Sequence, residues 1–252
     1  VEVWDGKTLT EPNYNATEDV YEINAGSQLA WLAAAVSGTL PDTRAVAATS
    51  FAGETFKLTS DINLGENAWK PIGLGGEHFE GIFDGQGHTI TGLKVTERFG
   101  GDRFALFCSL AGSAQIKNLV IDNAYIKYPG DGEDCYASAI AGTIYGNILF
   151  DNITVKNSTI TGNNKVGAIF AHDGSSTQIT IDECHVDSCY IASEDTVDGG
   201  CVGGLIGYYA TGNKNKPNTI SNSSVKNSTI VGINSTNSGK RANSEFIGCI
   251  LT

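Results

Sequence analysis

The sequence contains no methionine and only five prolines, and it has no run of the roughly 20 apolar residues that a bilayer span requires. The apolar run Leu29–Val36 is too short for a span and lacks the basic flank of a signal peptide. We therefore expect no membrane span in this chain. The missing initiator methionine is typical of a processed or trimmed product, which fits an exported protein.

Positive charge is also scarce. The chain has 16 Lys and Arg against 28 Asp and Glu, which gives a formal net charge of -12. A negative field of this kind repels nucleic-acid phosphates and anionic lipid, so we expect no nucleic-acid partner. Cations and basic surfaces remain open as partners, although the charge can equally serve solubility alone.

The six cysteines are not arranged as a metal site, since the sequence has no Cys-x-x-Cys pair and no nearby histidine pair. In an exported chain they could form disulfides. Several of them instead fall at positions that the repeat described below makes interior, where cysteine acts as a small apolar residue. We therefore expect mostly free thiols. The cysteines are Cys108, Cys135, Cys184, Cys189, Cys201 and Cys249.

What the sequence does contain is an internal repeat. The hexapeptide Val155–Ile160 recurs as Val225–Ile230, and the wider pattern is apolar, x, Asn, apolar, x, apolar. A second register of small and aliphatic residues runs in parallel with the first. Copies of the first pattern begin at Ile90, Ile116, Phe150, Ile181 and Ile220; those of the second begin at Ala105, Ala139, Ala168, Gly204 and Glu245.

The repeats predict an all-β fold, a single-stranded right-handed parallel β-helix. Alternating residues within each copy point to one face, which only stacked copies can bury. The uneven spacing argues against a β-propeller, and the strands of a β-sandwich would not repeat in this way. Stacking also predicts two columns of asparagines whose amides bond along the helix axis. The columns are Asn118, Asn152 and Asn222, and Asn123, Asn157 and Asn227.

The first 60 residues differ from the repeats. Leu29, Leu32, Ala33 and Val36 form the apolar stripe of a short helix, with Ser27 as the predicted N-cap and Gly38 just past its end. A helix there would cover the open end of the β-helix. We therefore expect residues 1–60 to form a cap with lead-in strands and residues 61–252 to form one continuous β-helix. The last segment, 246–252, predicts a strand that a continuing chain or a second subunit would cover.

Several segments carry a resemblance to a known family. Phe56–Leu64 is followed by Trp69-Lys70-Pro71-Ile72-Gly73 and by Phe79–Ile90, which contains Phe83-Asp84-Gly85-Gln86-Gly87-His88. This order resembles β-helical surface proteins of gut-type bacteria that carry GLUG-like repeats. The resemblance implies a secreted or outer-membrane-attached location and an adhesin-like role. It supplies no catalytic residues.

An enzyme is the alternative, because many β-helices act on polysaccharides. Asp84-Gly85-Gln86-Gly87 is similar to a stretch of polygalacturonase-like enzymes, but such hydrolysis needs at least two converging carboxylates. We expect this motif to be a turn, in which Gly adopts positive φ and Asp bonds its own backbone. His78, His172 and His185 are scattered, and His172-Asp173 has no third member. We therefore expect no enzymatic activity.

The loops that join the two strand patterns vary most between the copies, and two of these loops are acidic. Clustered carboxylates could hold Ca²⁺, although a solvated surface explains them equally well. We expect no other metal and no cofactor. The calcium candidates are Asp131, Glu133 and Asp134 in one loop and Glu194, Asp195 and Asp198 in the other.

Tyrosines provide the candidate binding surface. Tyr125 and Tyr190 occupy equivalent outward positions two turns apart, and Tyr128 and Tyr136 lie near loops. Exposed tyrosine rings stack on sugar faces at little entropic cost. The sequence therefore predicts a surface module that binds glycan or a host or cell-surface protein. A polysaccharide-degrading hydrolase or lyase and a passive structural stalk are the alternatives.

Overall fold

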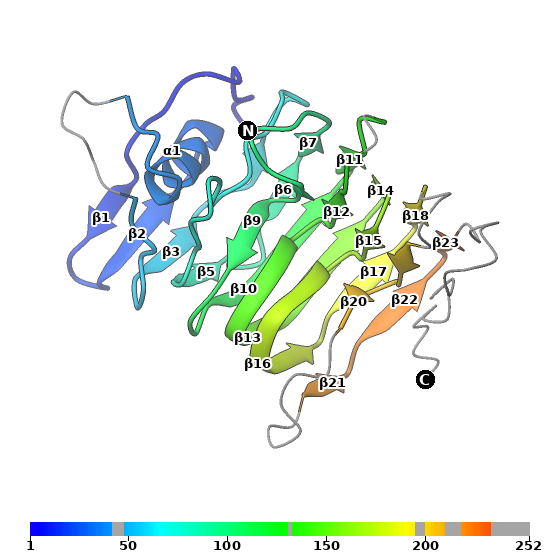
Figure 1. The fold of residues 1–252 in the computed structure, drawn as a ribbon. Coiled ribbons are helices and arrows are strands. Elements are labelled where there is room, and N and C mark those ends of the chain that lie inside the picture. Colours follow the sequence, from blue (N-terminus) through cyan, green and yellow to red (C-terminus); the bar gives the residue numbers. More distant parts are fainter. Residues whose placement is uncertain (42–47, 131–132, 195–199, 210–217, 233–252) are drawn as a thin grey trace.

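The structure is a computed structural model that describes residues 1–41, 48–130, 133–194, 200–209 and 218–232. It is a parallel β-solenoid of about 5 turns with one short helix at its N-terminal end (Figure 1). This confirms the predicted fold class. Glu245, Cys249 and the predicted final strand lie outside the described residues.

The strands form three sheets that run along the solenoid, which we call sheets A, B and C. Within the described residues, all strand pairs are parallel except the first, β1 with β2. Sheet A contains β1 (Asn13–Asn15), β2 (Val20–Ile23), β3 (Thr55–Leu58), β4 (Ile62–Asn63), β5 (Ile82–Asp84), β6 (Thr89–Thr91), β9 (Phe107–Leu110), β10 (Gln115–Asp122), β13 (Ala141–Lys156), β16 (Phe170–Asp182), β17 (His185–Asp187), β20 (Ile206–Tyr208), β21 (Thr219–Ser221) and β22 (Ser224–Lys226).

Sheets B and C are narrower, since each turn contributes only one short strand to each of them. Sheet B contains β7 (Lys94–Val95), β11 (Tyr125–Lys127), β14 (Thr159–Gly162), β18 (Tyr190–Ser193) and β23 (Thr229–Gly232). Sheet C contains β8 (Arg103–Phe104), β12 (Tyr136–Ala137), β15 (Lys165–Val166) and β19 (Cys201–Val202).

The core is a set of files of apolar side chains, one residue from each turn. Ile116 pairs in register with Phe150, Phe150 with Ile181, and Ile181 with Ile220, as the repeat predicts. In the last described turn the prediction of an interior residue was wrong, because Ile220 is 42% exposed. Phe150 and Ile181 have no exposed surface. A fully buried aromatic or branched side chain contributes about 2–3 kcal/mol through its burial, so these files carry much of the stability of the solenoid.

The first repeat copy is in a different register from the one predicted. Ile90 pairs with Ile121 rather than lying below Ile116, whose partner in that turn is Phe83. The prediction was wrong because the pattern occurs twice in each turn, five residues apart. Gly92 therefore stacks below Asn123 and not below Asn118.

The two predicted asparagine columns are present, and the backbone explains the choice of residue. Each column occupies a turn in the left-handed region, with φ from 49° to 57° at all six asparagines. Asparagine tolerates this conformation better than most residues with a Cβ. Among the described residues, one bond joins two of these amides, from Asn152 Nδ2 to Asn118 Oδ1 at 2.9 Å. Four of the amides donate to aspartates of the preceding turn, as Asn157 does to Asp122 at 2.8 Å.

The small residues that follow these turns point inward. Cys184 and Cys189 are free, buried thiols just after two of the left-handed residues, as expected for cysteines used as small interior residues. Burial raises the pKa of the Cys184 thiol to about 12. The thiol therefore stays protonated and unreactive at neutral pH.

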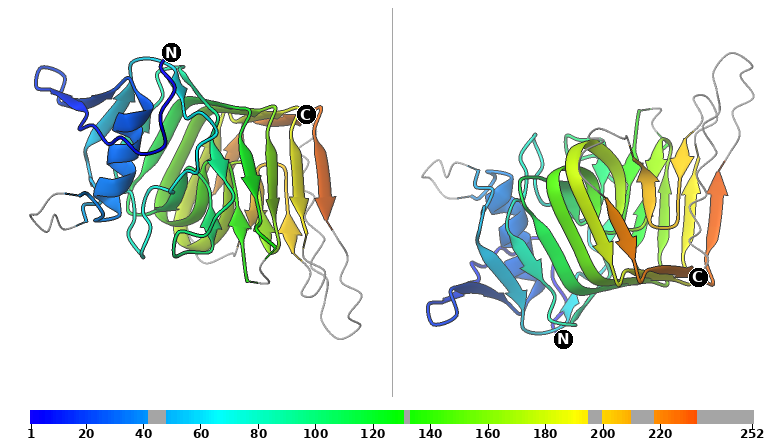
Figure 2. Two further views of the ribbon diagram at one scale, coloured as in Figure 1. Left: turned by 90° about the horizontal axis from the view of Figure 1, so that it is seen from above. Right: turned by 90° about the horizontal axis from the view of Figure 1, so that it is seen from below.

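The helix α1 (Gly26–Val36) lies across the N-terminal end of the solenoid, as predicted for a cap (Figure 2). Its N-cap is Ala25, not Ser27, and no side chain caps it. The helix begins earlier because the Gln28 and Leu29 amides donate to the Ala25 carbonyl. Gly38, with φ 63°, follows the last turn as expected. The predicted boundary near residue 60 falls just after β3, which already pairs in parallel with β5.

Candidate functional site

The outward face of sheet B carries the two predicted tyrosines in one column. Tyr125 pairs with Thr159 and Thr159 with Tyr190, so the two rings lie two turns apart, or roughly 10 Å by strand spacing. Tyr125 is 43% exposed and Tyr190 is 44% exposed. They are among the most exposed large side chains of the described solenoid, and a bound molecule can reach both rings.

The strands of sheet B, like those of sheet C, differ from sheet A in charge. The five strands of sheet B contain no Asp or Glu, and Lys94 and Lys127 are their charged residues. The tyrosine column continues toward the cap, because Lys94 pairs with Tyr125 and Ala68 pairs with Lys94. This face therefore runs from the cap to β23 without a carboxylate in its strands.

The other two predicted tyrosines lie elsewhere. Tyr128 is partly buried and packs against the hydrophobic core just beyond β11. Tyr136 belongs to β12 of sheet C and pairs with Arg103 and Lys165. The structure therefore brings Tyr125 and Tyr190 together and separates Tyr128 and Tyr136 from them.

Tyr136 instead joins a cluster that the sequence did not suggest. Its ring centroid lies 4.9 Å from that of His172, which lies 5.7 Å from that of Tyr208. The Lys165 ammonium group also lies between the two tyrosines, 4.6 Å from the Tyr136 ring centroid and 4.9 Å from the Tyr208 ring centroid. Two tyrosine rings thus bracket an imidazole and an ammonium group.

The electrostatics of this cluster follow from its partial burial. Burial lowers the pKa of Lys165 and raises that of Tyr136. Burial, reinforced by the Lys165 charge, lowers the pKa of His172 to about 4. The imidazole is therefore neutral at pH 7, far from the pKa that suits a general acid or base there. A signal did exist in the sequence, since His172 and Tyr208 both stand four residues after the start of a copy in the second register.

The acidic loops are only partly described. Asp131, Asp195 and Asp198 lie outside the described residues. Asp134 accepts a hydrogen bond from the Asn164 amide at 2.9 Å, and the Glu194 amide donates to the Gly162 carbonyl. Within the described ranges, no three His, Cys, Asp or Glu residues come close enough to hold a metal ion. The calcium site stays a prediction.

The remaining polar motifs have structural roles. The Asp84 carboxylate accepts hydrogen bonds from the Gln86 amide at 3.0 Å and from the Asn118 side chain at 3.0 Å, as expected of a turn. Gly87 adopts positive φ in that turn. His185 lies between buried Cys184 and Val186, with Nδ1 3.0 Å from the Ser224 hydroxyl. The contacts of Asp84 and Gly87 are those of a turn, as the sequence predicts.

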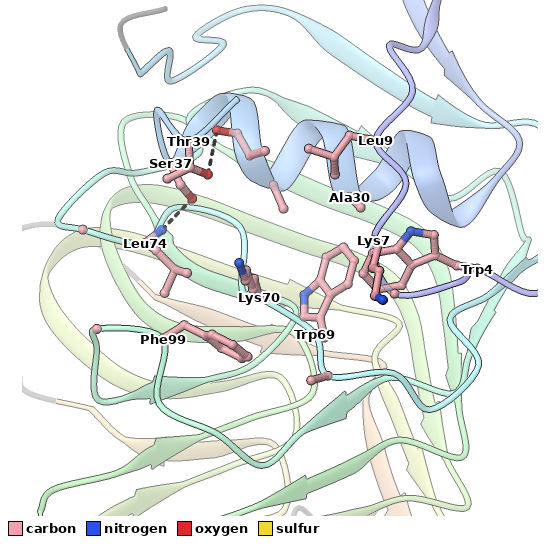
Figure 3. Close-up of a pocket in the computed structure, with 16 residues that line it drawn as sticks. Trp4, Lys7, Leu9, Ala30, Ser37, Thr39, Trp69, Lys70, Leu74 and Phe99 are labelled. Carbon is pink, nitrogen blue, oxygen red and sulfur yellow. Dashed lines mark hydrogen bonds between the residues drawn. The ribbon is translucent and has the colours of Figure 1, made fainter. Parts of the chain in front are cut away.

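A pocket of about 640 Å³ lies between α1 and the first turns of the solenoid (Figure 3). Three alanines of α1 line one side, and Leu74 and Phe99 lie opposite them. Trp4 and Trp69 close one end, with their indole rings in edge-to-face contact at 5.7 Å. Its size is typical of small-molecule sites. No sequence pattern indicated it, because segments far apart in the chain form it.

No protein-family model matches the chain, so the resemblance to GLUG-repeat proteins stays a prediction. A part of the chain is similar to Halomucin of Haloquadratum walsbyi, with 32% identity over 144 residues. That match covers 52% of this chain and 2% of Halomucin. The chain is also 32% identical over 110 residues to a protein of Evansella cellulosilytica described as "Putative Gly-rich membrane protein". That match covers 41% of this chain and 12% of the relative.

The chain thus spans only a small part of these relatives. Among the described residues, no helix has the length and apolar character to cross a membrane. Among solved structures, the fold is similar to that of a protein of Bacteroides ovatus described as a "putative immunoglobulin A1 protease". The TM-score is 0.53 at 18% identity, with 89% of this chain and 74% of that one covered. At this identity the similarity concerns the β-helical fold alone.

Proposed function

We propose that the chain is a cell-surface or secreted binding module that recognises glycans through the outward face of sheet B. The observation that carries the proposal is the column of Tyr125 and Tyr190, which stand exposed in equivalent positions on a rigid scaffold. Flat aromatic rings offer contact area to the apolar faces of sugars at low entropic cost. A repeating scaffold also suits a repeating ligand.

The charge of the face supports the same proposal. Sheet B has Lys94 and Lys127 but no carboxylate in its strands, within a chain of net charge -12. A neutral or acidic glycan on this face therefore contacts no carboxylate of the sheet B strands. The similarity to a relative described as a membrane protein supports a location at the cell envelope.

The test is binding of the purified chain to an array of bacterial, plant and host glycans, followed by the double substitution Tyr125→Ala with Tyr190→Ala. Each aromatic contact is worth about 0.5–1.5 kcal/mol, so the double variant should bind about 5- to 150-fold more weakly. Tyr14→Ala provides the matched control, because Tyr14 is 47% exposed but lies in β1, outside sheet B.

Unchanged binding by the double variant would reject sheet B as the recognition surface. Absence of binding to every glycan on the array would reject glycan recognition altogether and favour the structural stalk. Release of reducing ends or of unsaturated uronates from the bound glycans would instead favour the polysaccharide-degrading alternative.

A further inference from the structure

The pocket between α1 and the solenoid combines an apolar lining with an unusual charge pattern. Ala30, Ala33 and Ala34 of α1 supply one wall, and Leu9 and Phe99 add partly exposed apolar groups. The indole N–H groups of its tryptophans already donate to backbone carbonyls, from Trp4 to Thr8 and from Trp69 to Leu106. These rings are buried, so they close the end of the pocket and offer a ligand no hydrogen bonds.

Lysines provide the charge of the pocket. Lys7 and Lys70 are exposed at the surface and line it, and no Asp or Glu is found among the lining residues that the structure describes. The Lys70 ammonium lies 5.7 Å from the Phe99 ring centroid. Neither lysine has a carboxylate partner among the described ion pairs. Two uncompensated cations beside apolar walls favour a ligand with an anionic group and an apolar face.

The pocket also lies at the end of the tyrosine column. Ala68, which lines it, is exposed and stands in the same register column as Lys94 and Tyr125. By strand spacing the rim of the pocket is roughly 10 Å from Tyr125. A chain-like ligand that lies on sheet B could therefore place its end unit in the pocket.

We infer that this pocket binds a carboxylated sugar unit, with the carboxylate between Lys7 and Lys70 and the apolar face of the ring against the partly exposed side chains of Leu74 and Phe99. The inference rests on the proposed function for the class of ligand and adds a second site with its own residues. The Ser37 hydroxyl oxygen already accepts the Leu74 amide at 3.0 Å, which leaves its proton to donate to a sugar hydroxyl.

The test uses free monosaccharides, which are too small to span both sites. Glucuronic, galacturonic and N-acetylneuraminic acids are titrated against the intact chain, with glucose and galactose as neutral counterparts. The readouts are ligand-observed NMR and tryptophan fluorescence, since two of the three tryptophans line the pocket. We expect at least one acid to bind and its neutral counterpart to bind at least tenfold more weakly.

The double substitution Lys7→Gln with Lys70→Gln should weaken binding of that acid by tenfold or more, since hydrogen bonds to charged groups are worth about 1.5–3 kcal/mol. Both lysines are exposed, so the fold should be retained, as an unchanged melting temperature would verify. Lys226→Gln is the matched control, because Lys226 is an exposed lysine of β22, outside the pocket.

Each outcome is decisive for the pocket. No binding of any acid, equal binding of an acid and its neutral counterpart, or full binding by the Lys7 and Lys70 double variant would overturn the inference. The Tyr125 and Tyr190 double variant separates the two proposals, because it should lose the longer glycan and still bind the free acid. If the tyrosine variant alone lost the free acid, the pocket would also be rejected.

Discussion

The outward faces of sheets A and B are built on the same turns and differ in how their polar groups are used. On sheet A, four aspartates accept side-chain amides from the following turn, and two of them also face a lysine. On sheet B, no hydrogen bond between described residues involves the hydroxyl of Tyr125 or Tyr190. The aspartates are Asp84, Asp122, Asp182 and Asp187.

The polar groups of sheet A bond to one another and stabilise the solenoid, whereas the tyrosine hydroxyl groups of sheet B remain available to a ligand. Polar groups that are satisfied internally gain little from a ligand, because binding must first replace their existing bonds. Exposed rings without such bonds lose only water. Substitutions on sheet A should therefore change stability, whereas substitutions on sheet B should change binding.

The largest effect is expected for the core that both faces share. Phe150→Ala empties a fully buried position between Ile116 and Ile181, and should lower the free energy of unfolding by about 3–5 kcal/mol. Circular dichroism and tyrosine fluorescence during urea unfolding should report the loss. Phe150→Leu should cost much less. If the alanine variant unfolded like the parent, the file of core residues would not carry the stability assigned to it.

A smaller effect is expected for the asparagine column beside sheet A. Asn152 has φ 51° and donates to Asn118, so Asn152→Ala loses a tolerated left-handed residue and a hydrogen bond. We expect a cost of about 1–2 kcal/mol in thermal unfolding. Asn152→Gly keeps the backbone conformation and should cost less than the alanine variant. Equal costs in the two variants would show that the amide, not the backbone, determines the choice of residue.

Acid should affect sheet A before sheet B. Hydrogen bonds from Ser221 and Asn222 lower the pKa of Asp182, and those from Asn227 and Ser188 lower that of Asp187. A carboxyl group whose pKa is lower in the folded state stabilises the fold above its unfolded value of 3.8, and this contribution is lost as the pH falls through the folded pKa. The melting temperature should therefore decrease as the pH is lowered below about 4. The decrease should be less steep in the double variant Asp182→Asn with Asp187→Asn than in the parent protein. Equal slopes in the two proteins would contradict this assignment.

The smallest effect on stability is expected on sheet B. Tyr125→Ser should change the free energy of unfolding by less than about 0.5 kcal/mol, as for surface residues without structural bonds. Differential scanning calorimetry would measure this change, with Asn152→Ala as the reference for sheet A. A loss of more than 1 kcal/mol would mean that the ring supports the fold and is not kept for a ligand.

Much of the fold could be predicted because a parallel solenoid places equivalent residues of successive turns directly above one another. The files of Ile116 and Phe150, the asparagine columns and the alignment of Tyr125 with Tyr190 all follow from that rule. The rule fails where a pattern fits two positions of one turn, as it did for Ile90. It also says nothing of the start of α1, which backbone bonds to Ala25 determine.

The sites formed between sheets or between distant segments could not be predicted. The Tyr136 and His172 rings come from different sheets, and their contact depends on how the chain bends between β15 and β16. The pocket joins Trp4, α1, Trp69 and Phe99, which no repeat relates. Periodicity gives the order along the axis of the solenoid, but it carries no information on distances across it.

The amide bonds of the asparagine columns all have the same direction. Among the described residues the later turn donates and the earlier turn accepts, from Asn118 to Asp84, from Asn157 to Asp122 and from Asn227 to Asp187. Each completed turn therefore presents the acceptors that the next one needs. A chain with this polarity can wind from its capped end in the order in which a ribosome delivers it, with every finished turn acting as the template for its successor.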